Sequence, residues 1–378
     1  MIEEFHFNIF NSIIAVGVIH GFFFSFFIFF RKKYNTKLHV FLALTVLALS
    51  LNNLQYWLYD VELLKNSPVL TKAYFLFEML IGPFFYLFVN AYLQKQICFK
   101  KVALVLTPFG IATISRFISY TTFQEEVYKR VYNSYLEIVI LIFNILFLFL
   151  IFRAIFIYEK KSKLQDGNKI IIKTAWLKTT LFVALGTIVF WVLGNHFITL
   201  PGFTRYYPLW ITISFLIYWI AYAAIFKAKL FKERKVIRKK VAILEPKSFI
   251  QPQSLVNSKS EKKKTNSKLY ADFEQLITEE KLYLNSQLSL DYTATKLNIS
   301  ANYLSQIVNN HSNYSFTDYI NQQRIGLAKQ LLVDPEFDKY TILSIALETG
   351  FNSKSSFYNA FKKVTQITPT QYKKSQLN

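Results

Sequence analysis

The chain has 378 residues, of which 53% are hydrophobic and 18% aromatic, and this composition is more apolar than that of an ordinary globular protein of its length. Its formal net charge of +21 favours an anionic partner, either nucleic acid or a lipid surface. The single cysteine, Cys98, excludes an intramolecular disulfide, a redox pair and a cysteine-based zinc site.

Seven apolar runs follow one another in the first part of the chain, and most are close to the roughly 20 residues that a helix needs to cross hydrocarbon. The runs are Asn8–Phe30, Leu38–Leu58, Ala73–Leu93, Val102–Phe123, Asn133–Phe152, Trp176–Phe197 and Pro208–Phe226. No run after Lys227 could cross a bilayer. The sequence therefore predicts an all-α protein, with a seven-helix transmembrane bundle in residues 1–226 followed by a soluble region.

Lysines and arginines are concentrated in alternate loops between these runs, and such loops stay on the cytoplasmic side. The rich loops hold Arg31, Lys32, Lys33, Lys37, Lys95, Lys100, Lys101, Arg153, Lys160, Lys161, Lys163, Lys169 and Lys173. The poor loops hold only Lys65, Lys72, Lys129, Arg130 and Arg205. We expect a multi-pass protein of a bacterial cytoplasmic (inner) membrane, with the amino terminus outside and the carboxyl terminus in the cytoplasm. A cleaved signal peptide is disfavoured because MIEEFHF is acidic.

Three ionisable residues lie inside the predicted spans, towards their outer ends, namely Glu78, Arg116 and Glu137. An ionisable group at such a position is a functional candidate, so the three are a candidate signal-sensing cluster. Snorkelling to the interface or a structural ion pair is the simpler alternative. Gly17 and Gly21 form a GxxxG pattern, which is typical of a helix-packing face.

Residues 227–268 form a basic juxtamembrane segment and a linker. The segment begins KAKLFKERKVIRKK, which is the strongest positive cluster of the chain. From about Arg238 to Lys268 the chain contains two prolines and many serines, asparagines and lysines, without a sustained apolar period. This composition predicts a flexible linker with a root-mean-square span of roughly 30 Å.

Residues 269–378 show helical periodicity again. The segments LSLDYTATKLNISANYLSQIVNN (288–310) and ILSIALETGFNSKSSFYNAFKKVTQITPTQY (342–372) each have the layout of a helix, a tight turn and a second helix. Asn298 lies at the first turn, where asparagine tolerates a left-handed backbone. FTDYINQQRIGLAKQLL (316–332) predicts a long amphipathic helix between the two units.

Four motifs in this region, DYINQQRIGLAKQLL, IALETGF, SFYNAFKK and TPTQY, follow one another in the order and spacing of a known family. Residues of about 270–376 thus resemble the DNA-binding domain of AraC/XylS-family transcriptional regulators. Thr293 and Gln366 depart from the family pattern, where an aliphatic residue and a glycine are usual. The resemblance implies two helix-turn-helix units whose recognition helices enter major-groove segments about 34 Å apart. Both units lie inside residues 265–378, so this segment is predicted to fold and bind DNA alone.

The same resemblance implies recognition helices at Ala301–Asn309 and Lys354–Lys362. Its base-facing candidates are Asn302, Ser305 and Gln306 on the first helix, and Lys354, Ser355 and Asn359 on the second. Asparagine and glutamine can pair with adenine, and lysine with guanine. The phosphate-contacting candidates are Ser353, Lys362 and Lys363. The alternative for each residue is a solvated side chain on an exposed helix face.

These patterns favour a membrane-tethered, sequence-specific transcriptional regulator whose transmembrane domain senses a signal or holds a dimer. The predicted partners are double-stranded DNA, membrane lipid, a second copy of the chain, and an unknown small-molecule or membrane signal; no cofactor and no metal is predicted. A transporter-like membrane protein with a regulatory DNA-binding tail is the alternative, although we see no internal repeat. An enzyme is disfavoured because the chain lacks a nucleophile with a plausible base and a glycine loop for phosphate.

Overall fold

The computed structural model describes residues 7–31, 36–63, 75–122, 133–163, 172, 174–197, 206–250 and 261–377. Regular structure in these residues is helical throughout, as the sequence predicts. The chain divides into two compact units. Unit 1 comprises Met1–Leu164 and Ile172–Ala228, and unit 2 comprises Gln165–Ile171 and Lys229–Asn378.

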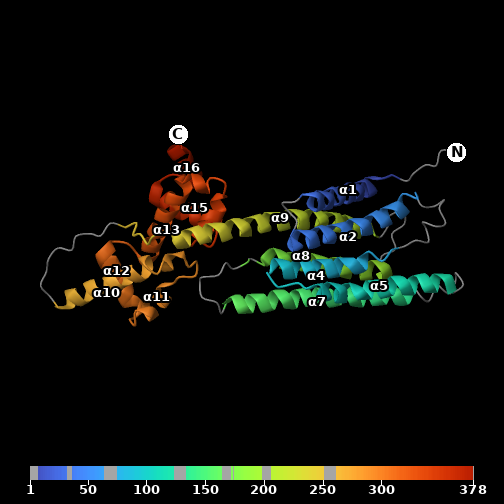
Figure 1. Ribbon diagram of the computed structural model, residues 1–378, viewed down its shortest axis with the longest axis horizontal. Helices are drawn as coiled ribbons and strands as arrows, with labels where there is room; N and C mark the ends of the chain where they lie inside the picture. Colours follow the sequence, from blue (N-terminus) through green and yellow to red (C-terminus); the bar gives the residue numbers. More distant parts are fainter. Residues whose placement is uncertain are drawn as a thin grey trace. The chain divides into compact units, whose positions relative to one another are not determined.

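Unit 1 is a set of long helices that lie side by side (Figure 1). They are α1 (Ile9–Phe30), α2 (Lys37–Asp60), α4 (Glu78–Tyr92), α5 (Phe99–Thr122), α7 (Asn133–Lys163), α8 (Ala175–Phe197) and the first part of α9 (Tyr207–Ile243). Six of these, all except α4, are long and apolar enough to cross a bilayer. Each of the six contains a predicted run over most of its length, but α7 and α9 continue beyond their runs, to Lys163 and Ile243.

The prediction of seven spans is not confirmed, and the difference concerns the third run. Its helix, α4, has 15 residues. At a rise of about 1.5 Å per residue such a helix is roughly 22 Å long, which is shorter than a hydrocarbon layer of about 30 Å. Residues 64–74, which include the start of the predicted run, lie outside the described residues.

Several residues on which the topology depends also lie outside the described residues. These are Lys32, Lys33, Lys65, Lys72, Lys129, Arg130, Lys169, Lys173 and Arg205. Residues 251–260 of the predicted linker lie outside them as well. The orientation in the membrane therefore stays a prediction that rests on the sequence.

The GxxxG pattern of α1 is a helix-packing face, as predicted. A Cβ atom built on Gly17 would lie 2.5 Å from the Cβ of Ser214 on α9. A Cβ atom on Gly21 would lie 1.9 Å from the Oγ of Ser50 on α2. Any larger residue at either position would therefore force the backbones apart.

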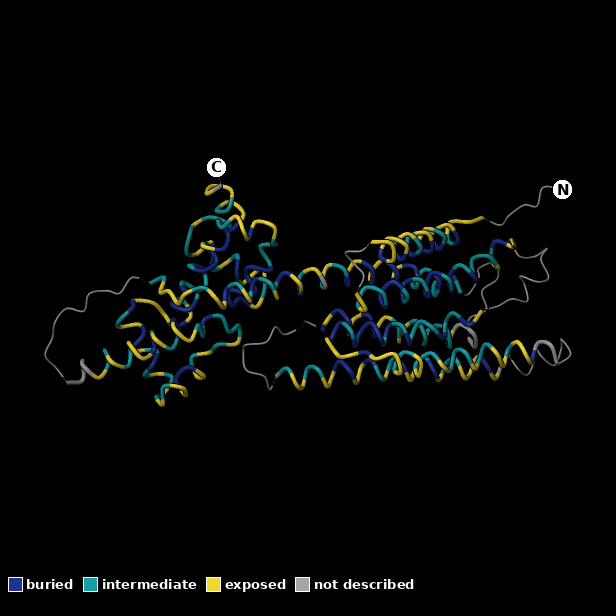
Figure 2. The backbone as a smooth tube through the Cα atoms, in the orientation of Figure 1, coloured by how far each residue is buried: buried dark blue, intermediate teal, exposed yellow. Residues whose placement is uncertain are grey.

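Figure 2 shows the buried and the exposed positions along the helices of unit 1. The buried positions include polar residues, and the exposed positions include many large apolar residues. Asn11 and Asn53 are fully buried, whereas Phe23 is 71% exposed and Leu104 is 73% exposed. The Nδ2 atom of Asn53 donates to the carbonyl oxygen of Trp210 at 3.0 Å and to the Oγ of Ser214 at 3.1 Å. Hydrogen bonds thus connect α2 to α9 inside the bundle.

Unit 2 has short helices around an apolar core (Figure 1). After the last part of α9 come α10 (Glu261–Thr278), η3 (Leu282–Leu284), α11 (Leu290–Lys296), α12 (Ala301–Ser312), α13 (Phe316–Val333), η4 (Pro335–Phe337), α14 (Ile342–Glu348), α15 (Lys354–Thr365) and α16 (Pro369–Leu377). Phe273, Tyr319, Phe357 and Phe361 are fully buried in this core.

The end of α9 belongs to the core of unit 2, which the sequence did not indicate. Ile237 and Val241, four residues apart and thus on one face of the helix, are buried in the core together with the residues of the helix-turn-helix units. Both ends of the linker predicted between residues 238 and 268 are therefore helical, because α9 continues to Ile243 and α10 begins at Glu261.

Candidate nucleic-acid interface

The first helix-turn-helix unit consists of α11 and α12, and serine side chains start both helices. The Oγ of Ser289 accepts from the Tyr292 amide at 3.2 Å, and the Oγ of Ser300 accepts from the Tyr303 amide at 3.3 Å. These bonds satisfy amide groups that the first turn of a helix leaves without a partner. Asn298, in the turn between them, has φ 54°, so the left-handed conformation predicted for it is confirmed.

Helix α12 buries one face and exposes the other. Leu304, Ile307 and Val308 are buried in the core, whereas Asn302 and Gln306 are exposed and Ser305 is partly buried. Asn302 and Gln306 are four residues apart and therefore share a face of the helix. The base-facing candidates of the first unit thus lie together on the outer side of α12.

The second helix-turn-helix unit consists of α14 and α15 and needs a glycine at its turn. Gly350 has φ +101°, and a Cβ atom there would lie 2.3 Å from the carbonyl oxygen of Tyr283. Thr341 starts α14 by accepting from the Ser344 amide at 3.2 Å. Ser353 and Ser356 form a reciprocal capping pair at the start of α15.

Helix α15 repeats the arrangement of α12. Phe357 and Phe361 are fully buried, while the base-facing candidates Lys354, Ser355 and Asn359 are exposed. Both recognition helices begin at the residues that the resemblance implies, and each extends three residues beyond the predicted end. The Nζ of Lys354 lies 5.2 Å from the ring centre of Tyr358, a contact that positions the side chain along the helix.

The three phosphate-contacting candidates differ in their surroundings. The side chain of Ser353 accepts the Ser356 amide at 3.1 Å and therefore serves as a helix cap. Lys363 donates to the Asp318 Oδ1 at 2.5 Å, and this bond lowers the pKa of Asp318 below its ordinary value. Lys362 is exposed in the last turn of α15. A phosphate contact by Lys363 requires that its ion pair opens, so Lys362 fits this role better.

Arg324 on α13 connects this helix to η3 and to the turn of the second helix-turn-helix unit, and the sequence analysis did not single it out. Its Nε donates to the carbonyl oxygen of Tyr283 at 2.7 Å, and its guanidinium carbon lies 5.6 Å from the ring centre of Phe351. Burial lowers the pKa of Arg324 to about 10, so the side chain stays charged near neutral pH. The signal that could have revealed it is an arginine among the apolar positions of DYINQQRIGLAKQLL.

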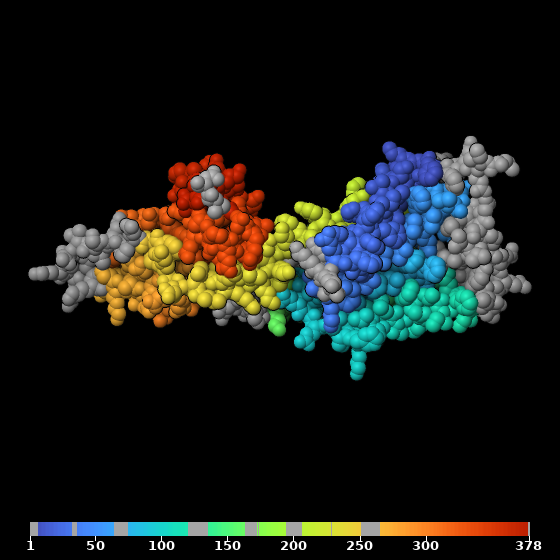
Figure 3. Space-filling view, turned by 45° about the horizontal axis from the view of Figure 1, so that its top comes forward, coloured from blue at the N-terminus to red at the C-terminus, as the bar shows by residue number. Residues whose placement is uncertain are grey.

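A second set of unpredicted contacts connects the end of α9 to the second helix-turn-helix unit. Glu348, whose side chain is 1% exposed, accepts from the Nε of Arg234 at 2.5 Å and from the Nε of Arg238 at 2.6 Å. Glu233 accepts from the Thr341 amide at 3.1 Å, at the start of α14. In Figure 3 the yellow residues of α9 lie against the red residues of the second unit. A glutamate in the otherwise apolar IALETGF was the available signal.

The chain after α9 is also held by unit 2. The Nζ of Lys281 donates to the carbonyl oxygens of Val241, Ala242 and Leu244, and so terminates α9. The Phe249 amide donates to the Oε1 of Gln323 at 3.0 Å. Leu244 and Phe249, which lie in the predicted linker, therefore contact other residues of unit 2.

The three intramembrane candidates lie on three helices of unit 1, Glu78 on α4, Arg116 on α5 and Glu137 on α7. Glu78 lines a cavity inside unit 1, whereas Arg116 and Glu137 are absent from its lining residues. Glu137 is exposed on α7, and Arg116 is partly buried on α5. The grouping of the three residues into one signal-sensing cluster stays a prediction.

A comparison with known families matches the carboxyl-terminal part of the chain. A family model described as a helix-turn-helix domain matches residues 293–375. The melibiose operon regulatory protein of Escherichia coli is 37% identical over 87 residues, which are 23% of this chain and 28% of that protein. The regulatory protein PocR of Salmonella typhimurium is 30% identical over 96 residues, which are 25% of this chain and 30% of PocR.

Among solved structures, the carboxyl-terminal domain of the response regulator yesN from Fusobacterium nucleatum is 31% identical, with a TM-score of 0.25. The match covers 29% of this chain and 98% of that domain. The chain spans at most about a third of the length of the curated relatives it matches. Residues 293–375 are a helix-turn-helix domain of the AraC type.

Proposed function

We propose that this protein is a membrane-tethered transcriptional regulator, in which unit 1 spans a membrane and senses a signal or holds a dimer, and unit 2 binds promoter DNA. The observation that carries the proposal is the pair of recognition helices, α12 and α15, each with a buried apolar face and an exposed polar face. These helices lie in a domain of the AraC type, and its curated relatives are regulatory proteins.

The arrangement of apolar side chains supports a bilayer around unit 1. Large apolar residues such as Phe23, Phe30, Leu104 and Tyr222 are exposed over most of the described helices of unit 1. In residues 229–378 the exposed large apolar residues are only Ile243, Tyr292 and Tyr314, among those that the structure describes. Such an extent of apolar surface is not stable in water but is favourable in lipid.

The charge distribution supports unit 2 as the DNA-binding and cytoplasmic part. Residues 227–378 contain 24 lysines and arginines against 13 aspartates and glutamates, a net charge of +11. A positive domain attracts the DNA backbone, and a positive segment directly after a span is retained in the cytoplasm.

Base reading can be tested with the full-length protein in lipid nanodiscs and a randomised DNA library. Asn302→Ala and Gln306→Ala should each cost about 1–3 kcal/mol at the preferred site and relax the preference at one or two base pairs. Gln275→Ala on α10, another exposed amide, is the matched control and should leave the preference unchanged. If the two α12 variants keep the full preference, the proposed register of α12 on DNA is wrong.

Backbone positioning can be tested in the same assay at several salt concentrations. Lys362→Ala should weaken binding to all sequences alike and reduce the salt slope by about one. A change in sequence preference in place of a change in slope would assign Lys362 to base reading.

Membrane topology can be tested with a reporter that is active only in the cytoplasm. Fusions after Lys101 and after Ser162 should be active, and fusions after Ser67 and after Thr204 should be inactive. Activity after Thr204 together with inactivity after Ser162 would reverse the proposed orientation. Activity at all four positions would argue against a membrane protein.

A further inference from the structure

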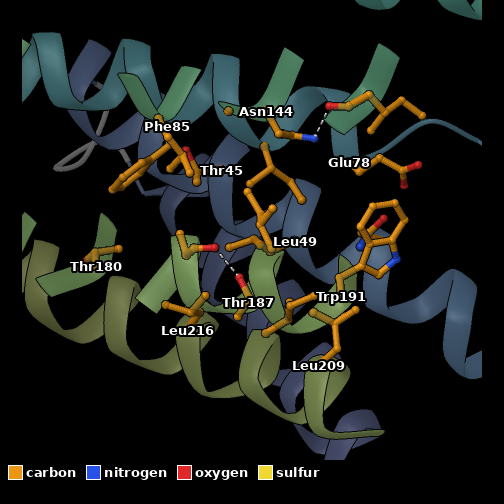
Figure 4. A pocket seen from close by; sticks show the side chains of 18 of the residues that line it. Thr45, Leu49, Glu78, Phe85, Asn144, Thr180, Thr187, Trp191, Leu209 and Leu216 are labelled. Carbon is orange, nitrogen blue, oxygen red and sulfur yellow. Dashed lines mark hydrogen bonds between the residues drawn. The ribbon is translucent and has the colours of Figure 1, made fainter. Parts of the chain in front are cut away.

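Unit 1 contains a cavity of about 210 Å³ between five of its helices, α2, α4, α7, α8 and α9. Figure 4 shows its side chains, with Glu78 and Trp191 toward one end and Phe85 and Thr180 toward the other. The wall is otherwise mainly aliphatic, with Leu49 and Leu216 as examples. A largely apolar cavity with a few polar groups is the usual form of a small-molecule site.

Three threonine hydroxyls of the wall are oriented as hydrogen-bond acceptors. Thr45 donates its hydroxyl hydrogen to the carbonyl oxygen of Phe41 at 2.7 Å, Thr180 to that of Trp176 at 2.8 Å, and Thr187 to that of Ala184 at 2.6 Å. Each of these hydroxyls uses its hydrogen within its own helix, so it can offer a ligand only its oxygen lone pairs. The carboxylate of Glu78 adds further acceptor atoms to the lining.

One acceptor of the wall is buried without a partner. Asn52 is 4% exposed and lines the cavity. Among the described residues, its Oδ1 atom has no hydrogen-bond partner. A buried amide oxygen in this state costs about 1–3 kcal/mol, so a ligand that donates to it gains that free energy back. The observation therefore points to a ligand with an N–H or O–H group.

The volume limits the size of the ligand. An apolar protein cavity of about 150 Å³ holds one benzene molecule, so 210 Å³ suits a molecule somewhat larger than a single six-membered ring. A whole phospholipid does not fit into this volume. We propose that the cavity binds a compact, mainly apolar molecule that carries an O–H or N–H donor, such as a substituted phenol or an indole. This molecule is the signal of the proposed regulator. Its role as the signal rests on the proposed function, whereas its binding to the cavity does not.

The binding can be measured with para-bromophenol as the probe and full-length protein in nanodiscs. Bromine quenches tryptophan fluorescence at short range, and Trp191 is the only tryptophan among the described residues that line the cavity. We expect saturable quenching that Trp191→Phe removes. Bromobenzene has the same ring without the donor, and its dissociation constant should be about tenfold higher because it leaves Asn52 without a partner.

Three variants separate the site from the surrounding lipid. Asn52→Leu should weaken para-bromophenol about tenfold and leave bromobenzene nearly unchanged, because it removes the acceptor and keeps the volume. Ala184→Phe fills the cavity and should abolish saturable quenching by both probes. Leu185→Phe is the matched control, since Leu185 is 47% exposed and is not a lining residue.

Each other outcome contradicts the proposal. Quenching that rises linearly with probe and does not respond to Ala184→Phe shows partition into lipid only. Equal affinity for the two probes in the unmodified protein shows an apolar void without recognition of a donor, and this comparison needs no variant to fold. Saturable binding that leaves DNA affinity unchanged keeps the site and overturns its role as the signal, while loss of DNA binding with probe binding intact overturns the proposed function alone.

Discussion

The two units of this chain place their polar and apolar residues in opposite ways. In unit 1 the amides of Asn11 and Asn53 are fully buried while Phe23 is 71% exposed. In unit 2 Phe273 and Phe357 are fully buried, and the exposed positions of α12 and α15 are polar. In both units apolar groups face an apolar medium. The arrangements are inverse because, as we propose, lipid surrounds unit 1 and water surrounds unit 2.

The exception to this division is the end of α9, because a helix that begins among the apolar helices of unit 1 ends in the core of unit 2. There Ile237 and Val241 are buried, and Arg234 and Arg238 enclose the carboxylate of Glu348. Glu348 is thus a charged side chain buried in unit 2. Changes at these contacts test how far unit 2 depends on α9, and we order them from the largest expected effect to the smallest.

The largest effect is expected from removing the end of α9. A fragment of residues 261–378 loses two buried aliphatic side chains, worth about 1.5–3 kcal/mol each, and leaves Glu348 without its arginines, at a cost of about 3–5 kcal/mol. This sum approaches the whole stability of a domain, which is about 5–15 kcal/mol. Urea unfolding followed by circular dichroism should therefore show a cooperative transition for residues 229–378 and little structure for residues 261–378.

That expectation revises the fragment 265–378 that the sequence predicts to fold alone. If the two fragments unfold at the same urea concentration, the contacts of α9 add nothing to unit 2 and the sequence-based boundary stands.

The next effect concerns the buried carboxylate itself. Glu348→Ala should destabilise residues 229–378 by about 3 kcal/mol, because two partly buried arginines lose a shared carboxylate partner. Glu336→Ala removes an exposed partner of Lys240 and should leave the stability almost unchanged, because water screens a surface ion pair. Combining Glu348→Ala with Arg234→Met and Arg238→Met should recover part of the loss. A loss of the same size in both single variants would show that burial of Glu348 does not matter.

Several local features of the two helix-turn-helix units could be predicted from the sequence. The starts of α12 and α15 and the exposed positions Asn302, Gln306 and Asn359 follow from periodicity and from the family motifs, because both record which face of a helix is buried. The all-helical class follows from the apolar runs. Contacts within a few residues, such as the left-handed turn at Asn298, are visible in the sequence for the same reason.

Sequence reasoning fails where the partner is distant along the chain. Arg234 and Arg238 read as part of a solvated basic cluster, because Glu348 lies more than a hundred residues away and nothing local marks the pair. The place of Glu78 in a cavity wall depends on five helices at once, so the sequence of one span could not predict it. The length of α4 was missed because hydropathy does not report where a helix begins.

In unit 1 the corresponding test is the buried amide of Asn53. Asn53→Leu removes the hydrogen bonds of Asn53 to Trp210 and Ser214 and should destabilise the full-length protein in detergent by about 1 kcal/mol. The effect is small because a hydrogen bond between two membrane helices contributes less free energy on average than a buried ion pair. Thr107→Ala is the control, since Thr107 is exposed and bonds only within its own helix. A stabilised Asn53→Leu variant would contradict a role for buried polar groups in joining these helices.

A smaller effect of opposite sign is expected at the end of α15. Gln366 ends this helix with φ 64°, which a residue with a Cβ adopts at a cost of roughly 1–2 kcal/mol and glycine adopts freely. Gln366→Gly should raise the stability of unit 2 by up to about 1 kcal/mol, since glycine also gains entropy in the unfolded chain. Lys362→Gly, inside the same helix, should instead lower it by about 1 kcal/mol. Equal signs for the two variants would show that the left-handed end is not strained.

The smallest effect concerns pH and the pair that joins α15 to α13. Lys363 lowers the pKa of Asp318 in the folded protein, so the pair contributes stability above the unfolded pKa of about 3.9 and loses it as the pH falls through the lower folded value. The side chains of Lys363 and Asp318 are 68% and 34% exposed, so the contribution should stay below about 1 kcal/mol. Lys363→Met should therefore be slightly less stable than the unmodified protein at about pH 6 and equal to it near pH 2.

The ion pair of Lys363 and Asp318 also affects DNA binding, because Lys363 has to leave this carboxylate before it can contact a phosphate. Lys363→Met should thus reduce the salt slope of DNA binding by less than Lys362→Ala, whose loss is about one. Equal reductions would show that the pair opens freely and that both lysines contact phosphate.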